Sequence, residues 1–258
     1  MIDDAGDGGD SAGDGGDSAG DAGDSAGSTS DDGDRGGHDT SVDAGVLADP
    51  SDVAVALEAG AALFNEGFVL AAHDPWEAAW LPLDTSGEGA DEPLLHGLIA
   101  TAAATHHAMD RNWVGAVGCA DNGVTYLTPL GSSYRGLALD PVRDWCRRLA
   151  ADPETVERAR RPTLRIDGVP VGFDNAGVAA ATVAAPVVAE TVPSIDASVV
   201  SAAAELAREE YGTGRTAVTE LVFAFLQEPD ARPQVVARLA DHVDRAERQR
   251  RDVDGLFE

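Results

Sequence analysis

The sequence predicts an all-α protein, an antiparallel helical bundle that follows a disordered acidic N-terminal tail. From Asp52 onward apolar residues recur at helical spacing in successive segments, and no strand-like run of convincing length interrupts them. The first fifty residues differ, because they hold 14 Asp and one Arg and almost no apolar side chains. Such a segment cannot offset its conformational entropy by burying apolar surface, so we expect it to stay disordered.

Three parts are expected along the chain: the tail over 1–50, a helical bundle domain over 51–172, and a helical C-terminal extension over 173–258. In the tail the segment GDSAG repeats every seven residues and places three serines, the first of them Ser11, in the G-x-S-x-G pattern of hydrolase nucleophile elbows. An elbow needs a strand before its serine and a helix after it. The tail offers neither, so we interpret the repeats as a compositional accident.

Helix ends in the first part are marked by capping residues, glycine and proline. The first helix is expected to begin after Asp52 and to end at Asn65-Glu66-Gly67, where Asn or Gly can adopt the left-handed cap conformation. Another begins at Asp140-Pro141, with Asp140 as N-cap and Pro141 as the first helical residue. The helices expected between them cover about 68–81, 93–109 and 113–127.

Residues 162–172 look extended, as a short hairpin or a strap. The Ala/Val-rich stretch after Gly172 is ambiguous in its helical character. Three amphipathic segments then predict further helices, at about 196–211, 215–227 and 233–250.

The charge of the chain excludes several functions. It carries 46 acidic and 18 basic residues, a formal net charge of -28, and every basic residue is Arg. Without Lys there is no Schiff-base chemistry and no P-loop lysine. The acidity argues against nucleic acid and against anionic membranes as partners. Uniform acidity with many small residues is typical of proteins from salt-in halophiles, where molar salt screens the self-repulsion.

The two cysteines and the N-terminus indicate a cytoplasmic protein. Cys119 and Cys146 have no metal or redox spacing and suit reduced thiols. The N-terminus has neither a basic nor an apolar region of the kind found in signal peptides. The longest weakly apolar stretch, 178–189, is broken by Pro186 and is too short to span a bilayer.

The candidate site is the stretch that contains His73, Glu77 and Trp80. If 68–81 is one helix, these side chains at i, i+4 and i+7 fall within about 60° of one another. Glu77 can then fix the tautomer of His73, while Trp80 supplies an apolar wall. His73 and Glu77 can also donate two ligands to a divalent metal, although a hydrolytic site needs a further ligand and an open position for water.

Pro75 leaves a second interpretation open. Inside a helix it removes a hydrogen bond and clashes with the carbonyl of Ala71. Alternatively Asp74 is an N-cap, Pro75 is the first helical residue and Glu77 is the acid of a capping box. In that case His73 lies outside the helix and the stripe does not form.

Further binding residues are expected around this stretch: Asn65, Trp76 and His96, together with Trp80. His96 and His107 share a face of their helix, but about 16 Å of rise separates them, so they cannot bind one ion together. Either can approach His73 across a helix pair. His106 and His107 otherwise suit a helix C-terminus, where the dipole favours imidazolium.

One short stretch is locally basic. It contains Arg158, Arg160, Arg161 and Arg165 in an otherwise acidic chain. Such runs are most often solvated faces, and the alternative is a site for an anionic ligand or an acidic partner.

Three motifs in order resemble a known family. They are Phe64-Asn65-Glu66-Gly67, then His73/Glu77/Trp80 as H-x-x-x-E-x-x-W, then Gly97-Leu98-Ile99. The sequence resembles the bacterial and archaeal family called Domain of Unknown Function 309 over about 52–140, more weakly over 162–168. The C-terminal region looks like the extension of haloarchaeal members.

The resemblance implies a small α-helical bundle and favours a helix that continues through Pro75. It also implies that the H-x-x-x-E-x-x-W residues form a possible active site, to which no reaction is attached. Asp74 stands where the family often has Glu, so a role for that carboxylate needs a shorter reach.

Two functions remain. The first is a ligand-binding or scaffold module with a buried His-Glu-Trp polar site, whose small-molecule or protein partner the sequence does not identify. The second is a small metal-assisted hydrolase that uses His73 and Glu77, with His96 as a third group. The module predicts a closed site, whereas the enzyme requires a third converging group and a water-accessible pocket. We favour the module, because no nucleophile, phosphate loop or ligand triplet is visible.

Overall fold

The computed structural model describes residues 47–83, 89–212 and 216–254. Within these residues the protein is all-α, as predicted: long helices form the body, and each strand has two residues. Nearly all of the predicted tail, including its serine-centred repeats, lies outside the described residues. No helix in the described part is both long and apolar enough to cross a membrane.

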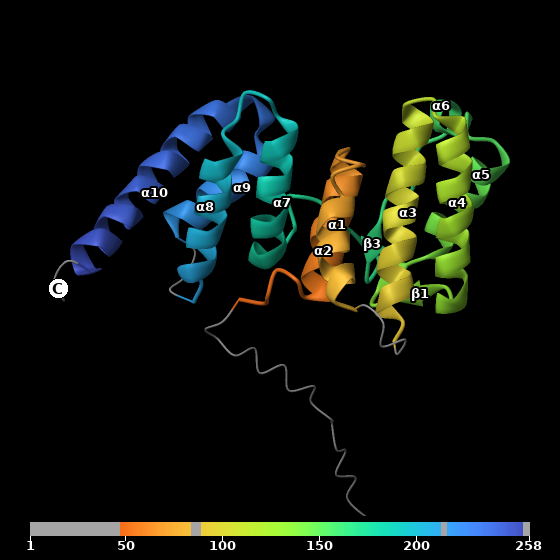
Figure 1. Ribbon diagram of the computed structural model, residues 1–258, viewed down its shortest axis with the longest axis horizontal. Helices are drawn as coiled ribbons and strands as arrows, with labels where there is room; N and C mark the ends of the chain where they lie inside the picture. The colour runs from red at the N-terminus through yellow and green to blue at the C-terminus, as the bar shows by residue number, and fades with distance from the viewer. Residues whose placement is uncertain (1–46, 84–88, 213–215, 255–258) are drawn as a thin grey trace, which may run out of the picture. The chain divides into compact units, whose positions relative to one another are not determined.

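The elements follow one another with short connections (Figure 1). In chain order they are α1 Val53–Glu66, α2 His73–Trp80, the 3₁₀ turn η1 Leu81–Leu83, α3 Asp91–Met109, α4 Trp113–Leu127, η2 Thr128–Leu130, β1 Ser133–Tyr134, β2 Leu137–Ala138, α5 Asp140–Ala151, α6 Thr155–Arg158, β3 Arg165–Ile166, β4 Val169–Pro170, α7 Val178–Thr191, α8 Ala197–Glu209, α9 Ala217–Gln227, η3 Pro229–Ala231 and α10 Arg232–Asp254.

Capping residues explain where α1 begins and ends. The Asp52 carboxylate accepts a 2.7 Å hydrogen bond from the Ala54 amide at the first turn. Gly67 ends the helix with φ 101°, a left-handed conformation in which its amide reaches back to the carbonyls of Leu63 and Phe64. Of the two cap residues that the sequence offered, glycine is therefore the one used.

Neither interpretation of Pro75 was fully right. The helix α2 begins at His73, so Val69 to Ala72 form turns in place of the first part of the expected helix. Pro75 is the third helical residue, and in the first turn an amide has no carbonyl partner within the helix, so proline costs no hydrogen bond there. Asp74 is inside the helix and is not its N-cap. His73 and Glu77 consequently keep their i, i+4 relationship.

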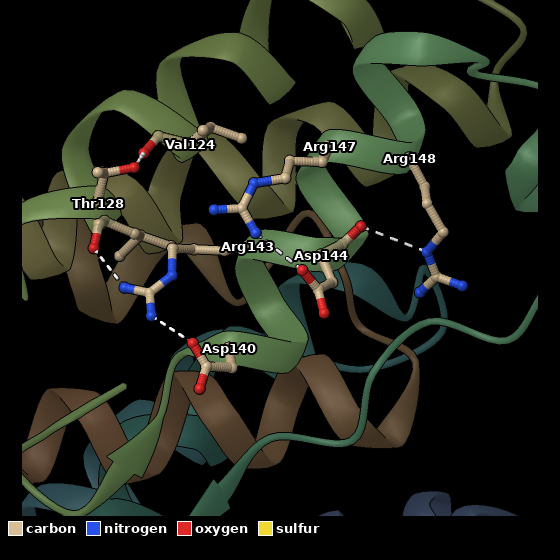
Figure 2. Close-up of polar contacts among 8 residues, drawn as sticks. Val124, Thr128, Asp140, Arg143, Asp144, Arg147 and Arg148 are labelled. Atoms are coloured by element: carbon tan, nitrogen blue, oxygen red, sulfur yellow. Dashed lines mark hydrogen bonds and ion pairs between the residues drawn. The ribbon is translucent and has the colours of Figure 1, made fainter. Parts of the chain in front are cut away.

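The start of α5 also differs from the prediction by one residue. Leu139 occupies the N-cap position and Asp140 is already helical. The Asp140 carboxylate accepts a 2.5 Å hydrogen bond from the Arg143 guanidinium, as Figure 2 shows, and is thereby drawn away from the capping role. Arg143, which is buried, also donates to the carbonyl of Leu127 at 2.8 Å.

The helices pack in neighbouring pairs. α1 packs against α2 and α7, while α3 packs against α2 and α4, and α4 against α5 (Figure 1). The larger core cluster extends from α1 and α2 through α3 to α7 and on to α10. A smaller cluster of Ala side chains with Trp145, Cys146 and Leu149 lies between α3, α4 and α5. The predicted boundary at residue 172, between a bundle domain and a C-terminal extension, stays a prediction.

The predicted hairpin at 162–172 is present as β3 and β4. It joins β1 and β2 in an antiparallel sheet of order β1-β2-β3-β4, in which Leu137 pairs with Ile166 and Arg165 with Pro170. This small sheet carries residues 159–163 past the C-terminal end of α1, which positions the arginines discussed below.

Candidate functional site

His73 lies between two carboxylates on α2. Its Nδ1 donates to Oδ1 of Asp74 at 3.3 Å, and its Nε2 lies 3.8 Å from Oε2 of Glu77. The contact with Glu77 follows from helix geometry, since residues one turn apart place their side chains on the same face. The spacing of His73 and Glu77 in the sequence therefore predicted their contact correctly.

The electrostatics of this trio favour a protonated imidazole. The hydrogen bond to Asp74 raises the pKa of His73, partial burial opposes that shift, and the negative charges of Glu77 and Asp74 add to it. His73 is thus an imidazolium over a wider pH range than an isolated histidine.

The trio is not buried, contrary to the prediction of a buried polar site. The side chains of His73 and Glu77 keep 29% and 44% of their surface exposed. The reason is that α2 presents this stripe outward, while Trp76 and Ala79 on its other side enter the core.

Trp80 and His96 belong to a different cluster, which joins α2, α3 and α4. Oε1 of Glu92 accepts hydrogen bonds from Trp80 Nε1 at 3.0 Å and from His96 Nδ1 at 3.2 Å. The His96 ring stacks on Tyr126 with centroids 3.9 Å apart and meets Trp80 at 4.8 Å. Within the described residues, neither a hydrogen bond nor a ring contact joins His96 to His73. Sequence reasoning missed Glu92 and Tyr126, and the i, i+4 spacing of Glu92 and His96 was the available signal.

Trp76 and Asn65, the other predicted binding residues, make internal contacts. Trp76 is 1% exposed, and its Nε1 has no hydrogen-bond partner among the described residues. The Asn65 amide nitrogen donates to the carbonyls of Leu164 and Val171 at 2.9 and 2.7 Å, and its Oδ1 accepts from the Leu164 amide at 2.8 Å. Asn65 thus fastens the β3–β4 hairpin to the end of α1.

The described residues hold no cluster of three or more His, Cys, Asp or Glu side chains placed to bind a metal ion. His73 and Glu77 are the two predicted ligands that lie close together, and His96 does not join them. The divalent metal stays a prediction that rests on two side chains.

A pocket that the predicted site residues do not explain lies beside the C-terminal ends of α1 and α3. It has a volume of about 490 Å³, and α5, α6 and residues 159–163 complete its wall. Its polar lining residues are Asn65, Thr105, Arg160, Arg161 and Thr163. The run of arginines was the signal in the sequence, but the position of the run relative to α1 and α5 is set by the tertiary fold. Neither His73 nor Glu77 lines this pocket.

Among the comparisons with known proteins, a family model matches part of the chain. No curated protein and no solved structure matches the chain. The match covers α2 and α3 whole and parts of α1 and α4, and therefore His73, Glu77, Trp80, Glu92 and His96. Residues 57–119 match the model of the family described as Domain of unknown function (DUF309).

Proposed function

We propose that this chain is a binding module that performs no chemistry at α2, and that Trp80 of the motif, together with Glu92 and His96, holds α2 against its neighbouring helices. The observation that carries this proposal is the double hydrogen bond to Glu92. One carboxylate oxygen of Glu92, on α3, accepts from Trp80 of α2 and from His96 one turn further along α3. The His96 ring also packs against Trp80 and against Tyr126 of α4, so both predicted site residues take part in contacts between helices. A satisfied polar network of this kind fixes the relative position of the elements that contribute to it.

The arrangement around His73 supports the same proposal over a metal-assisted hydrolase. A hydrolase of that kind needs at least three ligands and a position for water in a shaped cavity. His73, Asp74 and Glu77 instead lie along the outer stripe of one helix, and Asp74 and Glu77 flank the imidazole from its two nitrogens. An imidazole held in this way is suited to a surface ion-pair network.

Metal analysis by mass spectrometry tests the proposal. The protein is purified in molar KCl without chelator or His-tag, because we take its acidity as an adaptation to molar salt. His73→Ala, Glu77→Ala and Glu92→Ala are compared with His242→Ala, a control histidine on α10 that faces Arg245. We expect no metal that depends on His73 and Glu77, and a lower melting temperature for Glu92→Ala than for Glu77→Ala.

The opposite result is equally clear. Near-stoichiometric metal that is lost from both the His73 and the Glu77 variant, and kept by the His242 variant, would replace the module with the hydrolase. In that case hydrolysis of simple esters and phosphoesters by the metal-loaded protein becomes the next measurement.

A further inference from the structure

Two arginines line the 490 Å³ pocket in a chain whose net charge is -28. The lining residues that the structure describes include no Asp or Glu. A cationic pocket on so acidic a protein needs a physical reason, because carboxylates outnumber arginines along the chain. Four arginines lie within 158–165, and their contacts show which of them are paired inside the protein and which can still donate hydrogen bonds to a ligand.

Arg158 and Arg165 are engaged elsewhere and do not line the pocket. Arg158 pairs with Asp152 and with Glu154, and Arg165 donates to the carbonyl of Gly168 at 3.0 Å. The remaining carboxylate of α6, Glu157, pairs with Arg111 at 2.9 Å. The acids that precede Arg160 in sequence, Asp152, Glu154 and Glu157, are therefore paired with arginines outside the pocket.

Arg161 is held in place. Its Nε donates to the carbonyl of Phe64 at 3.1 Å and its Nη2 to that of Asn65 at 3.0 Å, and its guanidinium lies 5.7 Å from the centre of the Phe64 ring. These contacts satisfy carbonyls at the C-terminal end of α1 and use two of five N–H groups. The Nη1 donors remain for a ligand, and a guanidinium that is already ordered loses little entropy on binding.

Arg160 and Thr163 complete the polar side of the pocket. Both side chains are exposed, and neither forms a hydrogen bond or an ion pair with any residue that the structure describes. Arg160 can therefore approach a bound anion without breaking an existing pair. Two arginines that line one pocket favour oxyanions, which accept several N–H donors.

The deep side of the pocket is aromatic and apolar. Trp145 and Thr105 are fully buried, and the indole Nε1 donates to the Thr105 hydroxyl at 2.8 Å, so the polar atoms there are already satisfied. Met109, Val156 and Pro162 add apolar surface. A volume of about 490 Å³ suits a small molecule. One end of the pocket suits an anionic group of that molecule, and the other end suits an apolar group.

We propose that this pocket binds a small organic oxyanion, with its carboxylate or phosphate between Arg160 and Arg161 and its apolar body against Met109, Val156 and Pro162. This inference deepens the proposed function and rests on it, since it names the ligand class of a module without chemistry at α2. The proposed function and the proposed ligand can fail separately, because the metal content at His73 is measured independently of anion binding in the arginine-lined pocket.

Titration calorimetry in molar KCl tests the proposal with four probes: phenyl phosphate, phenylacetate, inorganic phosphate and benzyl alcohol. Molar salt screens the repulsion between an anion and the net negative chain. We expect phenyl phosphate or phenylacetate to bind, and the tighter of the two identifies the head group. Inorganic phosphate and benzyl alcohol each lack one half of the ligand and should bind at least about tenfold more weakly.

Arg160→Gln and Arg165→Gln form the matched pair of variants. Both residues are exposed, but Arg160 lines the pocket and Arg165 does not. Arg160→Gln should weaken anion binding about tenfold or more, and Arg165→Gln less than about twofold, with melting temperatures unchanged in both. Absence of binding by both organic anions, equal binding of benzyl alcohol, or equal losses in the two variants would overturn the proposal.

Discussion

Gly60 and Trp76 lie so close together that a β-carbon at position 60 would stand 2.3 Å from Cε2 and Nε1 of the indole. The contact joins α1 to α2 at the centre of the larger core cluster. Gly60→Ala should destabilise the protein by about 1–3 kcal/mol, because the buried ring must move away from its rotamer or the helices must separate. Denaturant unfolding at constant KCl measures the change.

Gly118 is the matched control for this prediction. It also lies within a helix, α4, but no heavy atom stands within 4 Å of a β-carbon built there. Gly118→Ala should therefore raise the free energy of unfolding by about 0.5–1 kcal/mol through helix propensity alone. Equal effects of the two substitutions would mean that the Gly60–Trp76 contact does not limit packing.

Trp76 and Trp145 are equally buried but differ in hydrogen bonding. Trp145 Nε1 donates to Thr105 at 2.8 Å, whereas Trp76 Nε1 has no partner in the described residues. Replacement by Phe removes a similar volume from each site. Trp145→Phe should cost about 1 kcal/mol more than Trp76→Phe, because it also removes a formed hydrogen bond, while Trp76→Phe removes a buried donor that is unsatisfied.

Urea unfolding of both variants beside the unsubstituted protein provides the comparison. Trp80→Phe extends it to a partly exposed tryptophan that donates to Glu92. A Trp76→Phe variant less stable than Trp145→Phe would show that the Trp76 indole N–H has a partner in solution.

The charge of His73 makes part of the stability depend on pH. Its folded-state pKa is raised above the ordinary value of 6.5, chiefly by the hydrogen bond to Asp74. The stabilising contribution of the imidazolium is therefore complete below pH 6.5 and is lost as the pH rises through the folded-state pKa. We expect the stability difference between the unsubstituted protein and His73→Gln to shrink over that interval.

Proton NMR of the His73 ring follows the same titration directly. Asp74→Asn removes the first cause of the shift and should lower the pKa of His73 toward 6.5. A ring that titrates at or below 6.5 in the unsubstituted protein would contradict the geometry of the trio.

Local signals predicted much of the fold. The bounds of α4, Trp113–Leu127, match the expected range, because Asn112 caps its N-terminus and its apolar pattern is regular. Gly67 predicted the end of α1 for the same kind of reason. The start of α2 was wrong, since the turns before His73 are held by bonds such as that from the Asp74 amide to Ala71, which leave no pattern in the sequence.

The site was predicted only where its residues are neighbours on one helix. His73 and Glu77 meet because four residues separate them. Trp80 instead turns to Glu92 twelve residues later, and spacing along one helix gives no distance to another. The arginine run was visible, but tertiary contacts alone decide that Arg158 is paired and Arg160 available.

Arg143 provides a last prediction, at the junction of α4 and α5. Its guanidinium is buried and donates to the Leu127 carbonyl at 2.8 Å and to Asp140 at 2.5 Å. Arg143→Met should lower the free energy of unfolding by about 1–3 kcal/mol, because it leaves that buried carbonyl without its partner. Denaturant unfolding in constant KCl measures the loss.

Arg147, one turn further along α5, separates this effect from the loss of charge (Figure 2). It forms an ion pair with Asp144 at 2.8 Å, but both side chains are more than half exposed. Solvent screens such a pair, so Arg147→Met should change stability by at most about 1 kcal/mol. If the two variants lost the same stability, the charge of α5 would matter more than the buried bond to Leu127. A large loss confined to Arg143→Met would instead assign the stability of the junction to the satisfied carbonyl at the end of α4.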